Sequence, residues 1–237
     1  MPIGINNISR RGGILDAFDI EIPDEEPKDT LYRWRADSIT VSDGTTGFAW
    51  PEENALSDAT AIGDPTYKNP PGASLYDGND GHDWSSDANM PSGNEAFSIL
   101  SYCYLPEDLT STNDLAIITW GTDELDSGSL LYLNGNNSYT VEHQAGGNAV
   151  TGTTEPPLGE WFTCGVSYDG SSRVVYLNGS SDGTDETGEL TITPEYHELG
   201  NSTWWITEGF EGYVAEIIVA DAEVSASEFS TYHNNRV

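Results

Sequence analysis

The chain has 237 residues, of which 40 are Asp or Glu and only 8 are Lys or Arg, so its formal net charge is −32. This charge excludes nucleic acid and anionic membranes as partners, because both require a basic face, and no apolar run approaches the roughly 18 residues of a spanning helix. A disordered acidic chain is also excluded, since 7 Trp, 12 Tyr and 6 Phe recur in regularly spaced segments.

Residues 1–30 differ in composition from the rest and predict an extended N-terminal arm with a linker. A short polar stretch containing Arg10 and Arg11 leads into an acid cluster flanked by Pro23 and Pro27. Two prolines so close together oppose both a helix and an inner strand. The arginine pair suits a twin-arginine export signal, but three acids interrupt the apolar region that such a signal needs. We therefore expect an arm that docks on a neighbouring protein through Arg10 and Arg11.

Residues 31–237 predict a single all-β domain. Short runs of β-branched and aromatic residues alternate with Gly, Asn, Asp and Ser clusters, which is the spacing of a sandwich or barrel. Residues 31–96 give only weak strand signals, at 32–34, 45–50 and 73–76, so we expect long loops and a few edge strands there. Clear strands are predicted at 97–104, 115–120, 129–133, 139–143, 161–168, 173–177, 190–193 and 213–220. The dipeptide Asn178-Gly179 predicts a tight hairpin, because both residues tolerate positive φ.

One short helix is predicted near the end of the chain. Ser225 and Glu228 have the spacing of a capping box, with Val224 and Phe229 placed as its hydrophobic staple. Phe229 and Tyr232 share one face by their spacing of three residues. We expect this helix to close one end of the sandwich.

The two cysteines leave two interpretations open. Cys103 and Cys164 each lie in an apolar, strand-like run. They could meet across a sheet as a disulfide, or both could be small buried hydrophobic residues. Two cysteines alone make no disulfide framework, so the sequence does not decide between them.

Residues 159–170 and 173–179 carry a family resemblance. A Trp-led strand that ends near Tyr-Asp-Gly, followed by a strand that ends in Tyr-x-Asn-Gly, resembles the laminin G-like members of the concanavalin A-like lectin/glucanase superfamily. Residues 97–99, 209–217 and the capped helix follow in the family's order, and residues 75–78 are similar to its Phe-Asp-Gly motif. The resemblance covers roughly residues 31–237 and implies a jelly-roll sandwich of two antiparallel sheets. It does not fix the function, because this fold hosts lectins, glycosidases and adhesion or assembly modules.

An acidic loop is the candidate metal site. Asp77, Asn79, Asp80 and Asp83 lie in one Gly-containing segment and offer the hard oxygen ligands that calcium accepts. They do not match the EF-hand register, and the Asp-Gly pair also suits a simple turn after a strand. Laminin G-like relatives often bind calcium, so the resemblance implies calcium as a cofactor here. The four histidines show none of the short spacings that zinc requires.

Carbohydrate binding needs an exposed aromatic face together with amide and carboxylate groups. Trp204 and Trp205 are adjacent, so in a strand they point to opposite faces and at least one should avoid the core. With Asn201 and Ser202 before them, they form the first candidate ligand site, and Trp84 beside the acidic loop is the second. The alternative for each Trp is packing, because large aromatic residues fill jelly-roll cores.

The sequence gives little support to catalysis. Related glycosidases use Glu-x-Asp-x-x-Glu, which brings a nucleophile and an acid together in a cleft. The nearest match, residues 21–26, has the wrong spacing, contains Pro23 and lies in the arm. Neither a Gly-x-Ser-x-Gly elbow nor a P-loop nor a dinucleotide fingerprint is present. We predict that the chain is not an enzyme, and glycoside hydrolysis is the weaker alternative.

The charge, the arm and the resemblance together predict a structural protein in the virion of a virus of halophilic archaea. Like charges repel over about 8 Å in physiological buffer but over only about 3 Å in molar salt, so this surface suits brine. The arm would dock on another virion protein, and the sandwich would form a homo-oligomeric spike, turret, decoration or tail-fibre module that binds host glycans. The alternative is a carbohydrate-binding or adhesion protein on the surface of a haloarchaeal cell.

Overall fold

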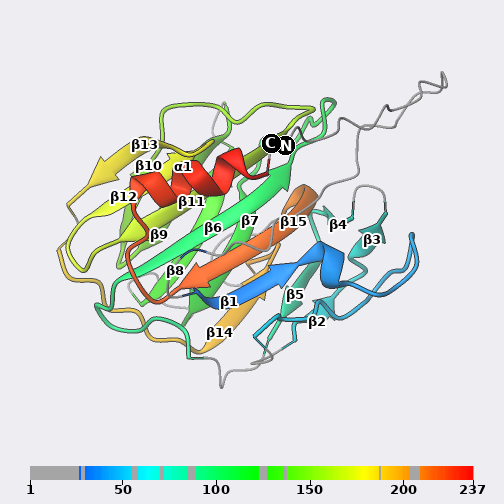
Figure 1. The fold of residues 1–237 in the computed structure, drawn as a ribbon, viewed down its shortest axis with the longest axis horizontal. Helices are drawn as coiled ribbons and strands as arrows, with labels where there is room; N and C mark the ends of the chain where they lie inside the picture. The colour runs from blue at the N-terminus through cyan, green and yellow to red at the C-terminus, as the bar shows by residue number, and fades with distance from the viewer. Residues whose placement is uncertain are drawn as a thin grey trace, which may run out of the picture.

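A computed structural model describes residues 27, 30–54, 58–69, 72–84, 89–122, 127–135, 138–186, 188–202 and 209–236. These residues form two antiparallel β-sheets packed face to face, with one α-helix on an outer face (Figure 1). The helices of the described part are too short or too polar to cross a membrane. The all-β jelly-roll sandwich predicted from the sequence, with its short C-terminal helix, is confirmed.

The first sheet has eight strands in the order β13-β12-β11-β6-β15-β4-β3, and β1 also pairs with β15. The ten-residue β15 carries two neighbours on one edge, because β4 pairs with its first half and β1 with its second half. The strands are β1 (Thr30–Arg35), β3 (Thr66–Lys68), β4 (Ala73–Asp77), β6 (Phe97–Tyr104), β11 (Trp161–Tyr168), β12 (Arg173–Leu177), β13 (Ser180–Asp185) and β15 (Glu211–Ala220).

The second sheet has seven strands in the order β10-β9-β8-β7-β14-β5-β2. Two segments that are distant in sequence, β14 and β5, continue the sheet beyond the β7–β10 meander. The strands are β2 (Thr60–Ile62), β5 (Gly81–Asp83), β7 (Leu115–Gly121), β8 (Gly128–Asn134), β9 (Thr140–Ala145), β10 (Asn148–Thr151) and β14 (Tyr196–Leu199).

Two predicted strands are wrong. Residues 45–50 and 190–193 contribute only isolated bridges to the fold, Thr46–Thr66 and Trp50–Ala59 in the first case and Gly93–Ile192 in the second. Gly47 has a φ of +61°, which turns the chain within the first segment. In the second segment the N–H of Leu190 donates to side chains rather than to a neighbouring strand. The predicted hairpin at Asn178-Gly179 is confirmed, with φ values of 48° and 72°.

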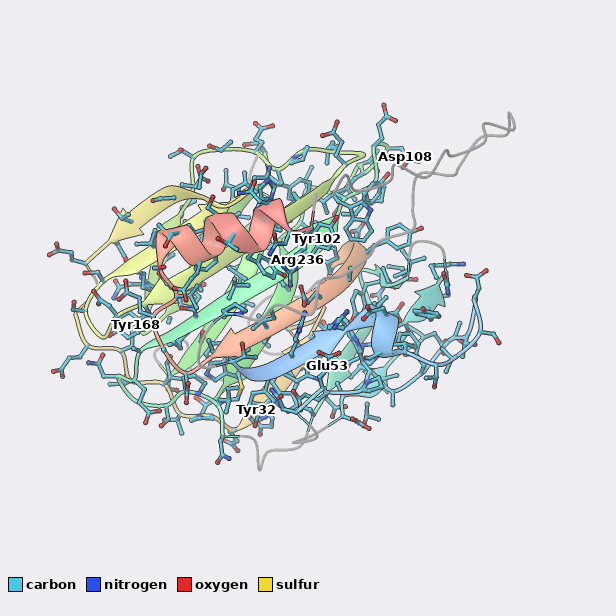
Figure 2. All side chains as sticks on the ribbon, viewed as in Figure 1. Tyr32, Glu53, Tyr102, Asp108, Tyr168 and Arg236 are labelled. Carbon is cyan, nitrogen blue, oxygen red and sulfur yellow. The ribbon has the colours of Figure 1, made fainter. Side chains whose placement is uncertain are left out.

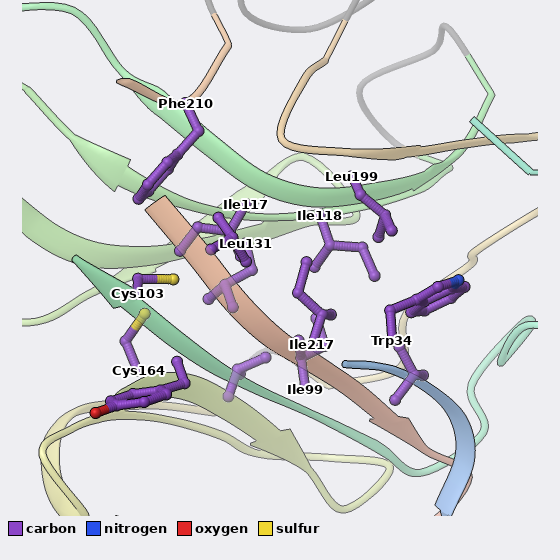
Figure 3. Packing of buried hydrophobic residues seen from close by; sticks show 14 of the residues in the cluster. Trp34, Ile99, Cys103, Ile117, Ile118, Leu131, Cys164, Leu199, Phe210 and Ile217 are labelled. Atoms are coloured by element: carbon purple, nitrogen blue, oxygen red, sulfur yellow. The ribbon is translucent and has the colours of Figure 1, made fainter. Parts of the chain in front are cut away.

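The core lies between the two sheets and is filled by alternating side chains of their inner faces (Figure 3). Ile99 and Ile217 of the first sheet meet Ile117, Ile118 and Leu131 of the second, and all are fully buried. Each such aliphatic side chain contributes about 1.5–3 kcal/mol by leaving water. Packing of this kind holds the strand ends, and therefore the loops, in fixed positions.

Cys103 and Cys164 are free thiols in this core, which is one of the two interpretations that the sequence left open. They lie on the adjacent strands β6 and β11, where Cys103 pairs with Phe162 and Cys164 with Ser101. Figure 3 shows both sulfur atoms between the sheets. Burial raises the pKa of the Cys103 thiol. Both residues are buried and serve as small hydrophobic groups in the core.

The helix α1 (Ala226–Asn234) begins with the predicted capping box, in which Ser225 and Glu228 satisfy each other's backbone N–H groups. Its position corrects our expectation, because it lies on the outer face of the first sheet and not at an end of the sandwich (Figure 1). Outward-facing Leu100, Tyr176 and Ile218 provide an apolar surface there. The ring of Phe229 stacks on that of Tyr176 with 3.8 Å between the centroids.

A buried ionic network joins β1, β15 and the end of the helix. Glu216 is fully buried between the guanidinium groups of Arg33 and Arg236, at 2.7 Å and 2.5 Å. The Tyr102 hydroxyl donates to the backbone oxygen of Arg236 at 2.6 Å, and Figure 2 shows these two residues beside the last turn of α1. One carboxylate therefore connects segments far apart in the sequence.

Candidate functional site

The acidic loop lies at the end of the sandwich where β4 and β14 finish and β15 begins. Asp77, the last residue of β4, pairs with Glu211, the first residue of β15. The N–H of Gly78 donates to the oxygen of Phe210 at 3.0 Å, and the N–H of Gly209 donates to the oxygen of Gly78 at 2.8 Å. Backbone hydrogen bonds therefore fix the turn at residues 78–80 against the chain that enters β15.

Asn201 reaches the same place from β14. A Cβ atom added to Gly81 would lie 2.6 Å from the Cβ of Asn201, so the two segments approach each other as closely as a glycine permits. The N–H of Gly200 donates to Ile117 of β7, and the oxygen of Gly200 accepts from Phe210, both at 2.8 Å. Asn201 is thus held next to the acidic loop, and its Oδ1 accepts a hydrogen bond from the N–H of Ser202 at 2.8 Å.

Like charges gather in this loop. Asp80 is 8% exposed and accepts a hydrogen bond from the backbone N–H of Asp64 at 2.8 Å. Burial raises the pKa of the Asp80 carboxyl, the bond from Asp64 opposes this shift, and the neighbouring carboxylate of Asp77 raises the pKa further. Two carboxyl groups so placed favour a shared proton or a nearby cation.

The oxygen donors only partly match a metal site. In the described part of the chain, no three His, Cys, Asp or Glu side chains converge as metal ligands. Asp77, Asn79 and Asp80 share the turn, but Asp83 stands apart on β5, where it lies opposite Thr60 and Glu198 of the neighbouring strands. Calcium at this turn would therefore depend on Asn79, backbone oxygens and water besides the two carboxylates.

The predicted aromatic residues have different outcomes. Trp84 is 5% exposed and packs against Trp34 and His197, with centroids 4.8 Å and 5.0 Å apart, so it lies in the core as the packing alternative requires. Its ring faces are not on the surface of the molecule. The predicted site residues Trp204, Trp205, Arg10 and Arg11 lie outside the described residues.

Sequence reasoning missed Asp64 and Glu211 as members of this site. Asp64 follows β2 and reaches Asp80 only because β2 pairs with β5. Glu211 approaches Gly78 closely, since a Cβ on that glycine would lie 3.2 Å from the Glu211 side chain. Neither residue has a local signal, because strand pairing between distant segments creates both contacts.

On the outer face of the second sheet, Glu142 and Glu198 are too far apart to act as a pair in glycoside hydrolysis, whereas Asp83 of β5 lies directly opposite Glu198 on the neighbouring strand. Glu198 is on β14 and Glu142 on β9, three strand spacings away, which amounts to about 14 Å at about 4.8 Å per strand. Glycosidases separate their catalytic carboxyl groups by about 5–9.5 Å. Glu142 is moreover engaged by Asn134 and Thr151, at 2.9 Å and 2.8 Å, and by the Tyr132 hydroxyl.

A buried Ser-His pair also has the wrong geometry for catalysis. Ser129 Oγ lies 2.9 Å from Nε2 of His143, and Arg173 Nη1 lies 3.3 Å from Nδ1 of the same ring. Arginine only donates, so Nδ1 accepts and Nε2 carries the proton that it gives to the serine. Burial and the charge of Arg173 both lower the pKa of His143, so the ring stays neutral at neutral pH. This histidine therefore cannot take the serine proton, and the fully buried group is structural.

Comparisons with known proteins find one matching family model and several solved structures of similar fold. A laminin G model, described as concanavalin A-like lectin/glucanases superfamily, matches residues 77–230. Domain 4 of AbnA, an extracellular GH43 arabinanase of Geobacillus stearothermophilus solved with arabinotriose, has a TM-score of 0.63 at 15% identity, covering 88% of this chain and 100% of that one. A search of curated protein sequences finds no match.

A second similar structure is Trypanosoma rangeli sialidase, with a TM-score of 0.60 at 12% identity. The superposition covers 90% of this chain but 33% of the sialidase, so the chain spans about a third of that enzyme. Sequence identities this low show only that the fold is shared, and they do not establish a shared activity.

Proposed function

The chain belongs to the concanavalin A-like lectin/glucanase superfamily, and on this basis we propose that it is a carbohydrate-binding protein without catalytic activity. The observation that carries the proposal is the convergence of Asp77, Asp80 and Asn201 at one end of the sandwich. The exposed carboxylate of Asp77 and the half-buried Asn201 are suited to capture sugar hydroxyls. The domain of the arabinanase that was solved with arabinotriose supports the same class of ligand.

Glycan binding tests this function directly. We expect the chain, in molar KCl, to bind members of a glycan array and Asn201→Ala to weaken that binding about tenfold or more. Trp204→Ala and Trp205→Ala test the aromatic residues that follow. Glu223→Gln serves as the control, because this exposed residue lies in the turn before α1, at the other end of β15. If glycan binding survives all three site substitutions, the proposed site is wrong. If the chain binds no glycan at all, the proposed function is wrong.

We also propose that the acidic turn binds calcium through Asp77, Asn79 and Asp80. A cation would relieve the repulsion between the two carboxylates. Isothermal titration should detect Ca²⁺ binding at the turn, and Asp80→Asn should abolish it while Asp83→Asn leaves it unchanged. Equal binding by the wild type and Asp80→Asn would contradict this assignment.

The setting that we propose is the virion of a virus of halophilic archaea, where the sandwich acts as a homo-oligomeric spike, turret, decoration or tail-fibre module. The net charge of −32 supports a role in brine, and residues 1–30 have the composition of an attachment arm. Deletion of residues 1–25 should prevent incorporation into particles while glycan binding persists. Recovery of the protein from cell envelopes and not from purified virions would favour the cellular adhesion alternative.

A further inference from the structure

A pocket with a volume of about 200 Å³ lies between the loops that join β6 to β7, β8 to β9 and β10 to β11. These loops are at the same end of the sandwich as the acidic turn, because β7 begins beside the end of β14. The pocket is separate from that turn and shares no lining residue with it. It belongs to none of the groups that the sequence singled out.

The lining of the pocket combines polar and apolar residues. Ser111, Thr112 and Ser138 contribute hydroxyl groups, and Glu155 contributes a carboxylate. Tyr139 and Leu158 supply apolar surface. A sugar ring offers a matching combination, because hydroxyl groups surround faces that are made of C–H bonds.

Leu158 is notable for its exposure. Its side chain is 43% exposed, and among the described residues only Tyr196, at 39%, is another large hydrophobic residue of this kind. Leu158 is nevertheless held firmly, since it forms a bridge with Leu105 and the N–H of the next residue, Gly159, donates to Leu105 at 2.8 Å. The fold thus keeps an exposed apolar side chain in the lining of the pocket.

Hydrogen bonds connect the described residues of the pocket walls. The Tyr139 hydroxyl donates to the oxygen of Ser111 at 2.7 Å, and the N–H of Gly135 donates to Asp114 at 2.9 Å. A Cβ atom on Gly135 would lie 2.3 Å from the oxygen of Asn113, so these two loops touch at a place that only glycine permits. A preformed pocket loses little conformational freedom on binding.

We propose that this pocket binds one neutral monosaccharide unit of a glycan, with its hydroxyls on Glu155 and Ser138 and an apolar face on Leu158. The inference rests on the proposed carbohydrate binding and adds a second subsite to it. The volume suits a single ring, since pockets for larger ligands measure about 300–1,000 Å³. The carboxylate of Glu155 disfavours acidic sugars because it repels their negative charge. In molar salt charges act over only about 3 Å, so this nearby carboxylate affects a bound sugar more than the net charge of the whole molecule does.

The test uses saturation-transfer NMR and titration of the full chain in molar KCl with free glucose, galactose, mannose, arabinose, N-acetylglucosamine and glucuronate. We expect weak, roughly millimolar binding of at least one neutral sugar and no binding of glucuronate. Leu158→Ser should weaken the neutral sugar about tenfold. Glu155→Gln should admit glucuronate, because it removes the charge and keeps the shape. Tyr196→Ala is the control, since it removes the other exposed hydrophobic side chain.

The outcomes separate this inference from the proposed function. If neither Leu158→Ser nor Glu155→Gln changes the binding of neutral sugars, the proposed pocket subsite is wrong and the proposed carbohydrate binding still stands. The pocket subsite is also wrong, and the proposed function stands, if free sugars do not bind but array glycans do and Asn201→Ala weakens that binding. Failure of the wild type with both free sugars and arrays would overturn both. Circular dichroism checks the fold, and Glu155→Gln provides the test if Leu158→Ser is unfolded.

Discussion

At the scale of single residues, the buried histidines make stability depend on pH. His82 is fully buried, with Nδ1 2.9 Å from the Tyr76 hydroxyl and Nε2 3.0 Å from the oxygen of Phe48. A carbonyl only accepts, so Nε2 carries the proton and Nδ1 accepts from the tyrosine. Burial lowers the pKa of His82 to about 4, and burial likewise lowers the pKa of His197 to about 4.

These shifts predict acid destabilisation. In the unfolded chain a histidine takes up its proton near pH 6.5, whereas in the folded chain it stays neutral down to about pH 4. Stability is therefore complete above pH 6.5 and is lost as the pH falls through this window, by about 2 kcal/mol for each histidine at pH 5. Urea unfolding in molar KCl at pH 7 and pH 5 measures the loss. His197→Phe should reduce it, and an identical loss in that variant would contradict the argument.

Glu216 predicts a second residue-scale effect. Glu216→Gln removes the buried counter-charge of Arg236 and one of two carboxylates beside Arg33, and breaking a buried ion pair costs about 3–5 kcal/mol. Urea unfolding should show a lower midpoint with an unchanged slope. Glu107→Gln, an exposed change, serves as the control. Equal stability of the two variants would mean that the network contributes little.

At the scale of elements, the cap of α1 can be tested in isolation. Ser225→Ala removes the hydroxyl that accepts from the N–H of Glu228 at 3.3 Å, and loss of such a cap costs about 1 kcal/mol. The thermal midpoint should fall by a few degrees. Ser230→Ala in the exposed middle of the helix should leave it unchanged or raise it slightly, because alanine favours helices. A larger fall for Ser230→Ala would show that the cap is not the cause.

The elements also show how far the sequence could lead. Strands such as β6, β11 and β15 are rich in β-branched and aromatic residues, and the capping box and Asn178-Gly179 are local signals, so all were predictable. β13 and β14 were not, because β13 consists almost wholly of small and acidic residues and β14 has only four residues. Their pairing with distant strands, and not their own composition, makes them strands.

The candidate sites follow the same division. The turn at Asp77 and Asp80 was visible in the sequence because its residues are neighbours, whereas Asp64 and Glu211 join it through long-range pairing. The place of α1 was missed because a capping box fixes where a helix starts and not where it packs. Only the apolar outer face formed by Leu100, Tyr176 and Ile218 determines that.

At the scale of the whole molecule, the net charge of −32 predicts a requirement for salt. Side chains that end in oxygen atoms project around the molecule in Figure 2, and the mutual repulsion of the acidic ones grows as the salt concentration falls. We expect the thermal midpoint, measured by circular dichroism, to rise steeply from 0.05 M to 3 M KCl. A variant with about ten exposed acids changed to amides should need less salt. If the wild type and this variant depend on salt equally, the salt dependence originates in the core and not in the exposed acids.

The pairing of β1 with β15 also bears on how the protein can be dissected. The family match begins at residue 77, after β1, β2, β3 and most of β4. A fragment that begins there would lack Trp34, which packs in the core, and Arg33, which pairs with Glu216. It would also expose the edge of β15 that β4 and β1 cover in the whole domain. Bare strand edges recruit other chains, so such a fragment is a candidate for aggregation during expression. Recombinant work should therefore retain the chain from Thr30 onward.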